Sequence, residues 1–539
     1  MPRRQWSFDY PQFPGKDFTD IVTLIPSSTL RRKTFYAIMV RLTKYNLAIC
    51  LVVAWGGFSY GFGFAIFVTS IGQPGFYDYF KLDPTTDYTA NILGAINALF
   101  NFGLAVGAIA QGYLADILGR KRAFALAATC SLIGAALVTG SVAIGMIITV
   151  RLLSGFGLGM LICLVPLYLT EVSPPQHRGF LSGFTTLSFG LGYVVCAWIS
   201  IGCYYATNLT VQWRVPLAMA CVGPLALLIG LPFIPESPRY LSLKGRNSEA
   251  WEVVRKLHHD PSDPEESAAH AEFTQIVRQV EFDKEQKTGY IDIFRKPSWR
   301  KRALLALFIQ FAVQSSGILG IANFLVLIFG SLGMTGVMPL LLYACFSTIG
   351  TICVLISILT VDKMGRRTMF LIGFPALAVC LLLEGVLQYK YLGTDNKAGL
   401  AACVAIIYLY IVCFQLVDSV AFIWVSEIFP TNIRAKGNSL GFFSYFVGAI
   451  TYTTPSVLAF KNIKYNMYFL YMALCIISTI VVYFFIPETK KIPIEEIGAL
   501  FGDEVVVHLT ADGHGIVEEG KDVRLEIEDA STVVHSQKV

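Results

Sequence analysis

Polar and aromatic side chains within long apolar segments are the residues of this sequence best suited to bind a ligand. Gln310 and Gln314 lie one helical turn apart in one such segment, and Gln415, Asp418 and Phe422 share a helical face in another. A side-chain amide is both a hydrogen-bond donor and an acceptor, as is a hydroxyl group. Leaving such groups unpaired in an apolar medium is costly. These positions therefore indicate a site for a hydroxyl-rich ligand, with hydrogen bonding between packed helices as the alternative.

A second group of chemically active residues is charged, and it occurs twice. Each copy has an Asp-x-x-Gly-Arg motif, a Glu-x-x-Pro motif that is followed by Arg, and a Pro-Glu motif. The two copies keep this order at a spacing of about 250 residues, which marks an internal duplication of a membrane protein. The residues are Asp116, Arg120, Glu171, Arg178, Glu236 and Arg239 in the first copy, and Asp362, Arg366, Arg367, Glu427, Arg434 and Glu488 in the second.

Helices long enough to cross a membrane must position these residues. Hydrophobic residues make up 55% of the chain and charged residues 15%, compared with about 45–50% and about 25% in ordinary globular domains. A bilayer core of about 30 Å needs about 20 apolar residues per helix. We therefore predict an all-α membrane protein with twelve transmembrane helices in two six-helix lobes that are related by the duplication. The predicted spans are approximately 46–70, 90–112, 123–145, 147–170, 179–203, 214–235, 303–329, 338–361, 368–389, 400–424, 437–460 and 467–487.

The distribution of Lys and Arg predicts the orientation of these helices. With both termini in the cytoplasm, the external segments hold only Lys81, Arg214, Lys390, Lys397, Lys461 and Lys464. We expect an integral protein of the plasma membrane. Its expected parts are a cytoplasmic N-terminal arm (1–45), a first lobe (46–239), a cytoplasmic linker with short helices (240–302), a second lobe (303–489) and an acidic cytoplasmic tail (490–539) that is disordered from 501 onward.

Other classes of function lack support in the sequence. It contains no nucleotide-binding P-loop, no CxxC motif, and no nucleophile–base pair or metal-ligand cluster. We therefore expect no enzyme activity, no metal, no cofactor and no nucleic-acid partner. The expected partners are a small-molecule substrate, the lipid bilayer and, in one alternative, protons.

The repeated motifs resemble those of the sugar porter family of the major facilitator superfamily, in particular its fungal branch, across residues 46–497. The resemblance implies transport of a sugar or polyol by alternating access. It also implies that Gln310 and Gln314 hold sugar hydroxyls, and that Phe422, at the position of a tryptophan in many relatives, stacks on the sugar ring. The motifs that carry it are Gly112-x-x-x-Asp116-x-x-Gly119-Arg120, Arg151-x-x-x-Gly155-x-Gly157-x-Gly159, Pro166-x-Tyr168-x-x-Glu171, Pro235-Glu-Ser-Pro-Arg239, Gln310-x-x-x-Gln314-x-x-Gly317, Asp362-x-x-Gly-Arg-Arg367 and Pro487-Glu-Thr-Lys490.

Several positions of the expected pocket depart from the family pattern. Thr186 stands where relatives have a sugar-binding glutamine, Leu319 replaces an asparagine, and Asn323 begins a pair that is two tyrosines in relatives. Asp418 and Ser419 stand in place of a Gly-Pro pair. A sugar or polyol remains the expected substrate, and another polyhydroxylated or acidic solute is the alternative.

The resemblance further implies that the charged motifs form a cytoplasmic gate. Their glutamates can meet arginines of the opposite lobe and hold the lobes together while the site faces outward. Each exposed ion pair contributes only about 0–1 kcal/mol, but a network of pairs biases two conformations that differ by a few kcal/mol. The alternative is that cytoplasmic positive charge simply anchors helix ends, which explains the arginines but not the glutamates.

Energy coupling has two interpretations. Proton-coupled relatives carry an aspartate in span one close to the arginine of span four. Here the matching residue is Gly63, so Arg151 lacks that carboxylate, which favours facilitated uniport. Asp418 supports the alternative, proton symport, because an apolar environment favours the protonated form of a carboxyl group. A non-transporting nutrient sensor on the same fold is a third alternative, although the short tails favour a carrier.

Overall fold

The computed structural model describes most of the chain from Lys44 onward. The described residues are 44–83, 86–173, 178–258, 266–283, 289–392, 394, 396–456, 459, 462–490, 492, 496–503, 508–509, 516–518 and 521–523. The chain divides into two units, Met1–Lys44 and Tyr45–Val539, and the helices and strands lie in the second unit apart from the first residue of α2. The predicted N-terminal arm therefore falls almost entirely outside the described residues.

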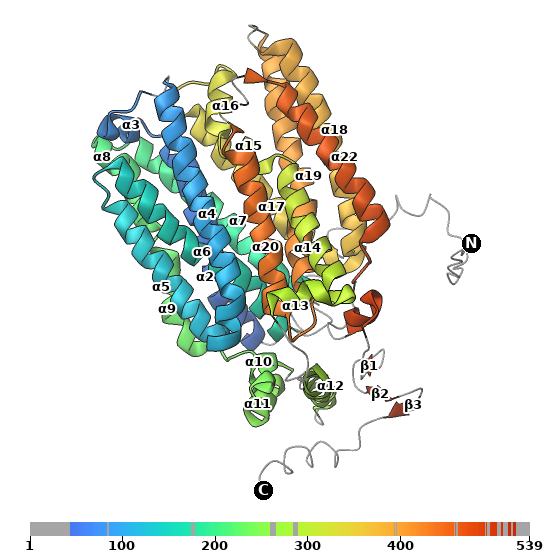
Figure 1. The fold of residues 1–539 in the computed structure, drawn as a ribbon. Coiled ribbons are helices and arrows are strands. Elements are labelled where there is room, and N and C mark those ends of the chain that lie inside the picture. The colour runs from blue at the N-terminus through green and yellow to red at the C-terminus, as the bar shows by residue number, and fades with distance from the viewer. Residues whose placement is uncertain are drawn as a thin grey trace, which may run out of the picture. The chain divides into compact units, whose positions relative to one another are not determined.

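The first half of the helical bundle forms from apolar segments that are separated by short polar turns (Figure 1). Polar side chains begin two of the helices: Thr86 accepts a hydrogen bond from the backbone of Thr89, and Asn208 accepts one from Thr210. The elements are α2 (Lys44–Ser70), α3 (Pro74–Phe80), α4 (Asp87–Leu118), α5 (Arg120–Thr139), α6 (Ile144–Val172), α7 (Arg178–Tyr204), α8 (Leu209–Met219), α9 (Val222–Gly230) and the 3-10 helix η3 (Leu231–Phe233).

The second half repeats this arrangement. Its first span is broken at Gly317, which has a φ of +85° and separates two helices; a Cβ atom there would collide with the ring of Tyr471. The elements are α14 (Pro297–Ser315), α15 (Ile318–Ala322), α16 (Leu325–Ser331), α17 (Met338–Met364), α18 (Arg366–Tyr391), α19 (Lys397–Glu427), α20 (Arg434–Thr453) and α22 (Asn466–Phe485).

The predicted all-α architecture is confirmed, with one helix of unusual composition. Among the described residues, eleven helical segments are long and apolar enough to span a membrane. The remaining predicted span, 437–460, corresponds to α20, which is long enough but carries Lys436, Asn438 and Ser439. These three side chains are buried in the protein. Because α20 presents its polar groups to neighbouring helices and not to lipid, it needs less apolar character than the other spans.

Short helices connect the two halves at one end of the bundle, which we call the linker end. The helices α4, α6, α17 and α19 finish there. Leu241, Val254 and Phe273 of the connecting segment form a small apolar core. The connecting helices are α10 (Pro238–Leu243), α11 (Asn247–Leu257), α12 (Ser267–Asp283) and α13 (Tyr290–Arg295).

The C-terminal tail contains more structure than its composition predicts. The helix η4 (Glu496–Phe501) is followed by three short antiparallel strands in the order β1 (His508–Leu509), β2 (Ile516–Glu518) and β3 (Lys521–Val523). Asp503 forms an ion pair with Arg302 and accepts a hydrogen bond from Ser298 at the start of α14. The described residues after 501 thus include regular structure that the composition did not predict, and Asp503 is held by polar contacts with the start of α14.

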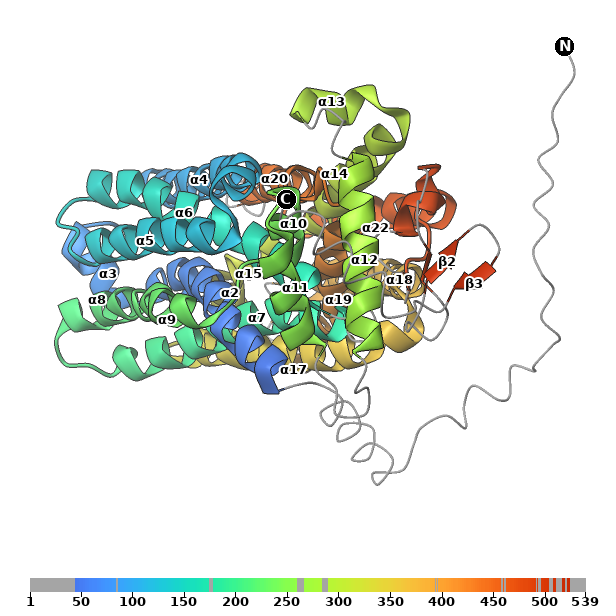
Figure 2. The ribbon, with the colours of Figure 1, turned by 90° about the horizontal axis from the view of Figure 1, so that it is seen from below.

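The two halves meet along two pairs of helices. α4 packs against α20, and α7 packs against α17; Figure 2 shows α4 beside α20. Glycines permit the close approach: a Cβ atom at Gly190 would contact Thr351, and one at Gly112 would contact Ser439.

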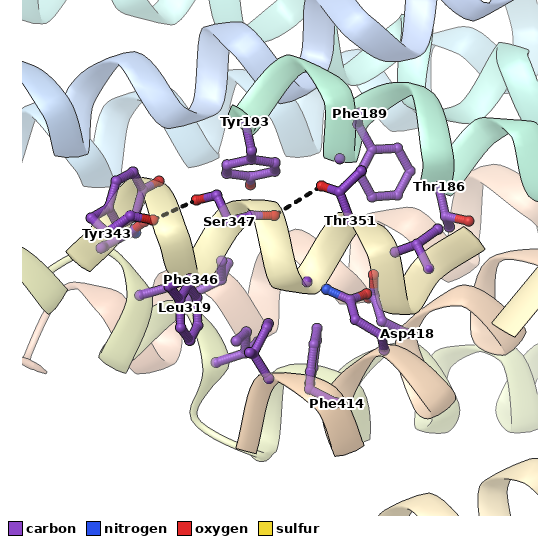
Figure 3. A pocket seen from close by; sticks show the side chains of 18 of the residues that line it. Thr186, Phe189, Tyr193, Leu319, Tyr343, Phe346, Ser347, Thr351, Phe414 and Asp418 are labelled. Atoms are coloured by element: carbon purple, nitrogen blue, oxygen red, sulfur yellow. Dashed lines mark hydrogen bonds between the residues drawn. The ribbon is translucent and has the colours of Figure 1, made fainter. Parts of the chain in front are cut away.

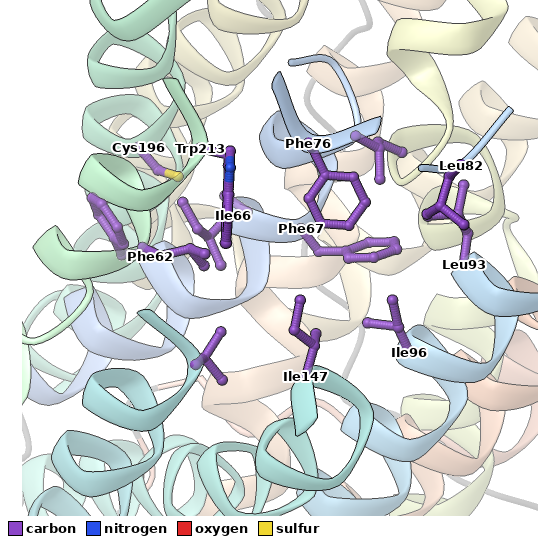
Figure 4. Close-up of a cluster of buried hydrophobic side chains, with 14 residues drawn as sticks. Phe62, Ile66, Phe67, Phe76, Leu82, Leu93, Ile96, Ile147, Cys196 and Trp213 are labelled. Carbon is purple, nitrogen blue, oxygen red and sulfur yellow. The ribbon is translucent and has the colours of Figure 1, made fainter. Parts of the chain in front are cut away.

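A cluster of aromatic and aliphatic side chains stabilises the first half at the end opposite the linker. The rings of Phe67, Phe76 and Trp213 lie together with Ile96 and Ile147 in this cluster (Figure 4). Its members come from α2 to α8. Burial of a large apolar side chain contributes about 1.5–3 kcal/mol in water, and the cluster therefore ties the short helix α3 to the spans.

Candidate functional site

A cavity lies between the two halves. Its empty volume is about 730 Å³, including space open to solvent. α2 and α7 contribute side chains from the first half, and α15, α17, α19 and α20 contribute side chains from the second. Figure 3 shows Phe189 and Tyr193 of α7 facing Ser347 and Thr351 of α17. The polar lining residues are Tyr60, Thr186, Tyr193, Asn323, Tyr343, Ser347, Thr351, Gln415, Asp418 and Tyr445.

Four residues predicted to bind substrate line this cavity: Thr186, Asn323, Gln415 and Asp418. The Nδ2 atom of Asn323, the Oε1 atom of Gln415 and the Oδ1 atom of Asp418 are buried and have no hydrogen-bond partner among the described residues. Each is costly to bury in this state. A ligand that offers both donors and acceptors would satisfy them.

Three other predicted substrate residues lie behind the lining. The Nε2 atom of Gln310 donates to the carbonyl oxygen of Ala421 at 3.5 Å, and Gln314 packs against Gly448. The face of α14 that carries both amides is thus turned towards α19 and α20. Phe422 is 1% exposed and packs against Phe189, with 5.1 Å between the ring centroids. Direct substrate contact by these three residues stays a prediction.

The sequence analysis missed the polar face of α17 and most of the aromatic lining. Tyr343, Ser347 and Thr351 lie at intervals of four residues and face the cavity together. The hydroxyls of Ser347 and Thr351 donate to the helix carbonyls of Tyr343 and Ser347, at 3.0 and 2.9 Å, so their lone pairs can accept hydrogen bonds from a ligand. The four-residue spacing of polar residues within the span 338–361 was the available signal.

Asp418 dominates the electrostatics of the cavity. It is the one charged residue in the lining of this cavity as the described residues define it, and no Lys or Arg lies beside it there. The tyrosines that interact electrostatically with it are Tyr60, Tyr193 and Tyr445. An unbalanced carboxylate repels anions and accepts hydrogen bonds. This arrangement suits neutral hydroxylated ligands better than acidic ones.

The arginines and glutamates of the first two charged motifs make their closest ion pairs within their own half; a gate that joins the halves through these motifs stays a prediction. Arg120 donates to both carboxylate oxygens of Glu171, at 2.9 and 2.8 Å, and both side chains are fully buried. Arg366 and Glu427 make the corresponding 2.9 Å pair in the second half. Since the duplication copied whole lobes, each copy retains partners for its own charges.

The Pro-Glu motifs bind helix N-termini. Glu236 accepts from the backbone N–H of Arg120 at 2.9 Å, and Glu488 accepts from that of Arg366 at 2.8 Å. A carboxylate is favourable at these positions because helix N-termini carry partial positive charge. Gly119 and Gly365, with φ of +89° and +96°, precede these helices, and a Cβ atom at either position would collide with the glutamate.

Arg239 and Arg367 contact their own half or the linker, whereas Arg434 contacts its own half and also interacts electrostatically with Glu171 of the other half. Arg239 donates to the carbonyl oxygen of Glu171 at 2.6 Å and pairs with Glu272 of α12 at 3.3 Å. Arg367 donates to the carbonyl oxygen of Tyr483, and Arg434 to that of Phe429. The side chain of Arg178 lies outside the described residues.

Other residues join the two halves at the linker end. Asp116 of the first half forms a 2.6 Å ion pair with Lys436 of α20. The Nδ2 atom of Asn438 donates to the carbonyl oxygen of Cys163 at 3.0 Å, and the backbone of Phe180 donates to Asp362 at 3.0 Å. We did not predict Lys436 or Asn438, although their polarity within an apolar segment was a signal.

The linker helix α13 reinforces this closure. The hydroxyl of Tyr290 donates to the carbonyl oxygen of Ile109 at 2.8 Å and lies 2.6 Å from the Oγ atom of Ser439. Burial raises the pKa of Tyr290, so the hydroxyl remains protonated and available as a donor. Tyr290 thereby bridges α4 and α20, which belong to different halves.

Replacing Asn438 by alanine is expected to weaken the closed linker end modestly. The variant loses one buried hydrogen bond between the halves, worth about 0.5–1.5 kcal/mol, which corresponds to a shift of roughly 2–10-fold toward the state open at this end. Distances between spin labels on the two halves at the linker end would report the shift. Asn432→Ala is the matched control, because its amide has no hydrogen-bond partner among the described residues; equal behaviour of the two variants would contradict the assignment.

Comparison with known proteins gives one family. A family model described as sugar (and other) transporter matches residues 49–501. The chain is similar to the MFS-type transporter criB of Aspergillus cristatus, with 31% identity, covering 85% of this chain and 94% of that protein. It is also similar to a high-affinity glucose transporter of Kluyveromyces lactis, with 28% identity and 87% of each chain covered.

A solved structure has the same fold. It is that of the proton:xylose symporter XylE, of the major facilitator superfamily, bound to 6-bromo-6-deoxy-D-glucose. The TM-score is 0.76 at 21% sequence identity, and the match covers 85% of this chain and 99% of XylE. The predicted fold, with two six-helix lobes, agrees with this similarity.

Proposed function

Given that the chain belongs to the sugar (and other) transporter family of the major facilitator superfamily, we propose that it carries a neutral sugar or polyol across the membrane by alternating access. One observation supports this most strongly. Three buried polar atoms, on Asn323, Gln415 and Asp418, converge on a cavity between the halves and lack partners among the described residues. Hydroxyl groups of a substrate would satisfy all three.

The closed linker end corresponds, in this proposal, to the outward-facing state. The excess of basic residues supports a cytoplasmic location for that end, and the proposed membrane is the plasma membrane. Asp116 and Lys436, with Asn438 and Tyr290, hold it shut. Substrate that enters from outside would meet the cavity, and separation of α4 from α20 would release it inward. The paired motifs within each half would keep each lobe rigid during this movement.

The charge of the cavity supports a neutral substrate over an acidic one. Asp418 has no basic residue beside it in the described lining, so a substrate carboxylate would find no cationic partner there. The relative from Kluyveromyces lactis carries glucose in its name. Phe189 and Tyr193 on one side of the cavity and Phe414 on the other offer apolar surface for the faces of a sugar ring (Figure 3).

Counterflow in vesicles that contain the purified full chain is the test of this function. Labelled glucose, xylose and myo-inositol are offered outside while the same unlabelled compound is present inside. Transient accumulation of at least one neutral compound is expected, and empty vesicles give the baseline. Labelled glucuronate is offered in the same way. Flux of glucuronate without flux of any neutral compound would mean that the protein carries acidic solutes. No flux with any member of a broad panel would favour a sensor on this fold.

The proposed mode of transport is facilitated uniport. It rests on Gly63, which leaves Arg151 without a carboxylate partner. A specific observation favours proton symport as the second candidate: the buried Oδ1 atom of Asp418 has no hydrogen-bond partner among the described residues, and a proton would neutralise the carboxylate. Uptake with and without an imposed pH gradient separates the two. Uniport predicts equal internal and external concentrations at long times, whereas accumulation that a protonophore and Asp418→Asn both abolish would establish symport.

A further inference from the structure

Arg151 is a buried cation whose charge the described part of the chain does not balance. The residue is 4% exposed and lies on α6, two turns from the end at Ile144. Its Nε and Nη2 atoms have no hydrogen-bond partner. The salt bridges of the described residues include none to Arg151, and no Asp or Glu is among the described residues that line its surroundings. A guanidinium group in this state is expensive to bury.

A second cavity lies beside this guanidinium group, within the first half. Its empty volume is about 390 Å³, including space open to solvent, and it is separate from the cavity between the halves. Besides Arg151, its polar lining consists of Ser59, Ser131 and Ser154. Gly63 also lines it, and the missing side chain at that position leaves part of the space.

Aromatic contacts compensate part of the charge. The guanidinium carbon lies 4.3 Å from the ring centroid of Phe100 and 5.2 Å from that of Phe67. Such contacts act through the faces of the guanidinium plane. The N–H groups point out at the edge of that plane, and those of Nε and Nη2 still lack acceptors among the described residues.

We propose that the cavity beside Arg151 binds a small inorganic anion of the halide class, which serves as the counter-ion of the buried guanidinium group. Arg151 donates hydrogen bonds to the anion from its free edge. The serine hydroxyls now donate to helix carbonyls, at 2.6 Å for Ser59, 2.9 Å for Ser131 and 3.1 Å for Ser154. Each can rotate to donate to the anion, because a hydrogen bond to a charged acceptor is stronger than one to a carbonyl.

The site is distinct in chemistry from the proposed substrate cavity. That cavity has an acidic residue and no base in its described lining, whereas this one has a base and no acid. The anion would bridge α2, α5 and α6 within one half, so its effect is on the stability of that half. The inference does not depend on which substrate the protein carries.

The test is thermal unfolding of the purified full chain in sodium chloride or bromide compared with sodium gluconate at equal ionic strength. Halide is expected to raise Tm saturably, by about 2–4 °C at a concentration near ten times Kd. Arg151→Gln is expected to lose this rise. Gly63→Asp supplies an internal carboxylate and is expected to lose it as well, after a shift of Leu158, whose Cδ1 atom would lie 2.6 Å from the new Cβ atom.

Gly63→Asn is the matched control, because it has the same size as Gly63→Asp without the charge. It is expected to keep the halide response if its side chain leaves space for the ion. If that side chain fills the space, the direct measurement is anomalous scattering, which would locate bromide beside Arg151. Equal Tm of the unmodified chain in halide and gluconate would overturn the proposal. A halide response that persists in both Arg151→Gln and Gly63→Asp would also overturn it, since the ion would then bind elsewhere.

Discussion

Asp418→Ala is expected to reduce the transport kcat/KM for the substrate by roughly 10–150-fold. The buried carboxylate lacks a hydrogen-bond partner on Oδ1 among the described residues and lines the cavity, so a substrate hydroxyl is its natural donor. A hydrogen bond to a charged group contributes about 1.5–3 kcal/mol, which converts to this range of fold-change. Initial rates of uptake, normalised to the amount of protein in the membrane, give the value.

Two controls separate recognition from folding. Ser419→Ala changes the next residue of α19, which does not line the cavity, and is expected to retain the kinetics of the unmodified chain. Asp418→Asn keeps the size of the side chain and removes its charge. In that variant, inhibition of glucose uptake by glucuronate is expected to increase relative to inhibition by glucosamine, because repulsion of the acid disappears. Unchanged kcat/KM in Asp418→Ala would mean that Asp418 contributes to helix packing and does not bind the substrate.

Lys436→Met is expected to open the linker end. The Lys436–Asp116 pair is partly buried, with side-chain exposures of 8% and 27%, and it joins the two halves. It is intermediate between exposed pairs and fully buried ones, so its loss is expected to cost about 1–3 kcal/mol in the closed state. The population ratio then shifts by roughly 5–150-fold toward the open state. Substrate transport falls because return to the outward-facing state becomes the slow step.

Pulsed electron paramagnetic resonance between labels at Lys244 and Lys363, both exposed at the linker end, would measure this shift as a longer distance. Arg246→Ala is the control, since the Arg246–Glu249 pair is 54% exposed on both sides and lies within the linker. Asp116→Asn and Lys436→Met should be non-additive in a double-mutant cycle. Additive effects of the two substitutions would mean that the pair does not act as the lock.

The sequence alone was sufficient to predict the long helices and the internal duplication. Backbone groups in a membrane must be satisfied within the segment, so long apolar runs have essentially one structure available to them. The span 437–460, which overlaps α20, was predicted from its apolar run even though it contains Asn438 and Ser439. Family membership likewise followed from motifs whose residue types and order can be read directly.

The partners of the charged residues could not be read in the same way. The motifs identified Arg120, Glu171, Glu236 and their repeats, but not whether they pair within a half or between halves. Glu236 lies 116 residues from Arg120 in the chain and caps its helix, a contact that only the folded lobe creates. Charge alone is not directional over such separations, since any arginine at the same end could satisfy the same glutamate.

Rotation and packing of the helices decided the candidate site. The periodicity of α14 placed Gln310 and Gln314 on one face, yet only packing determined that this face meets α19 and α20. Asp418 and Gln415 reach the cavity because α19 borders it. The helix α17, which belongs to the same half, adds Ser347 and Thr351. Sequence specifies which residues share a helical face, because helical periodicity is local. Which face meets a cavity depends on side-chain packing between helices that are distant in the chain, and only the tertiary structure determines it.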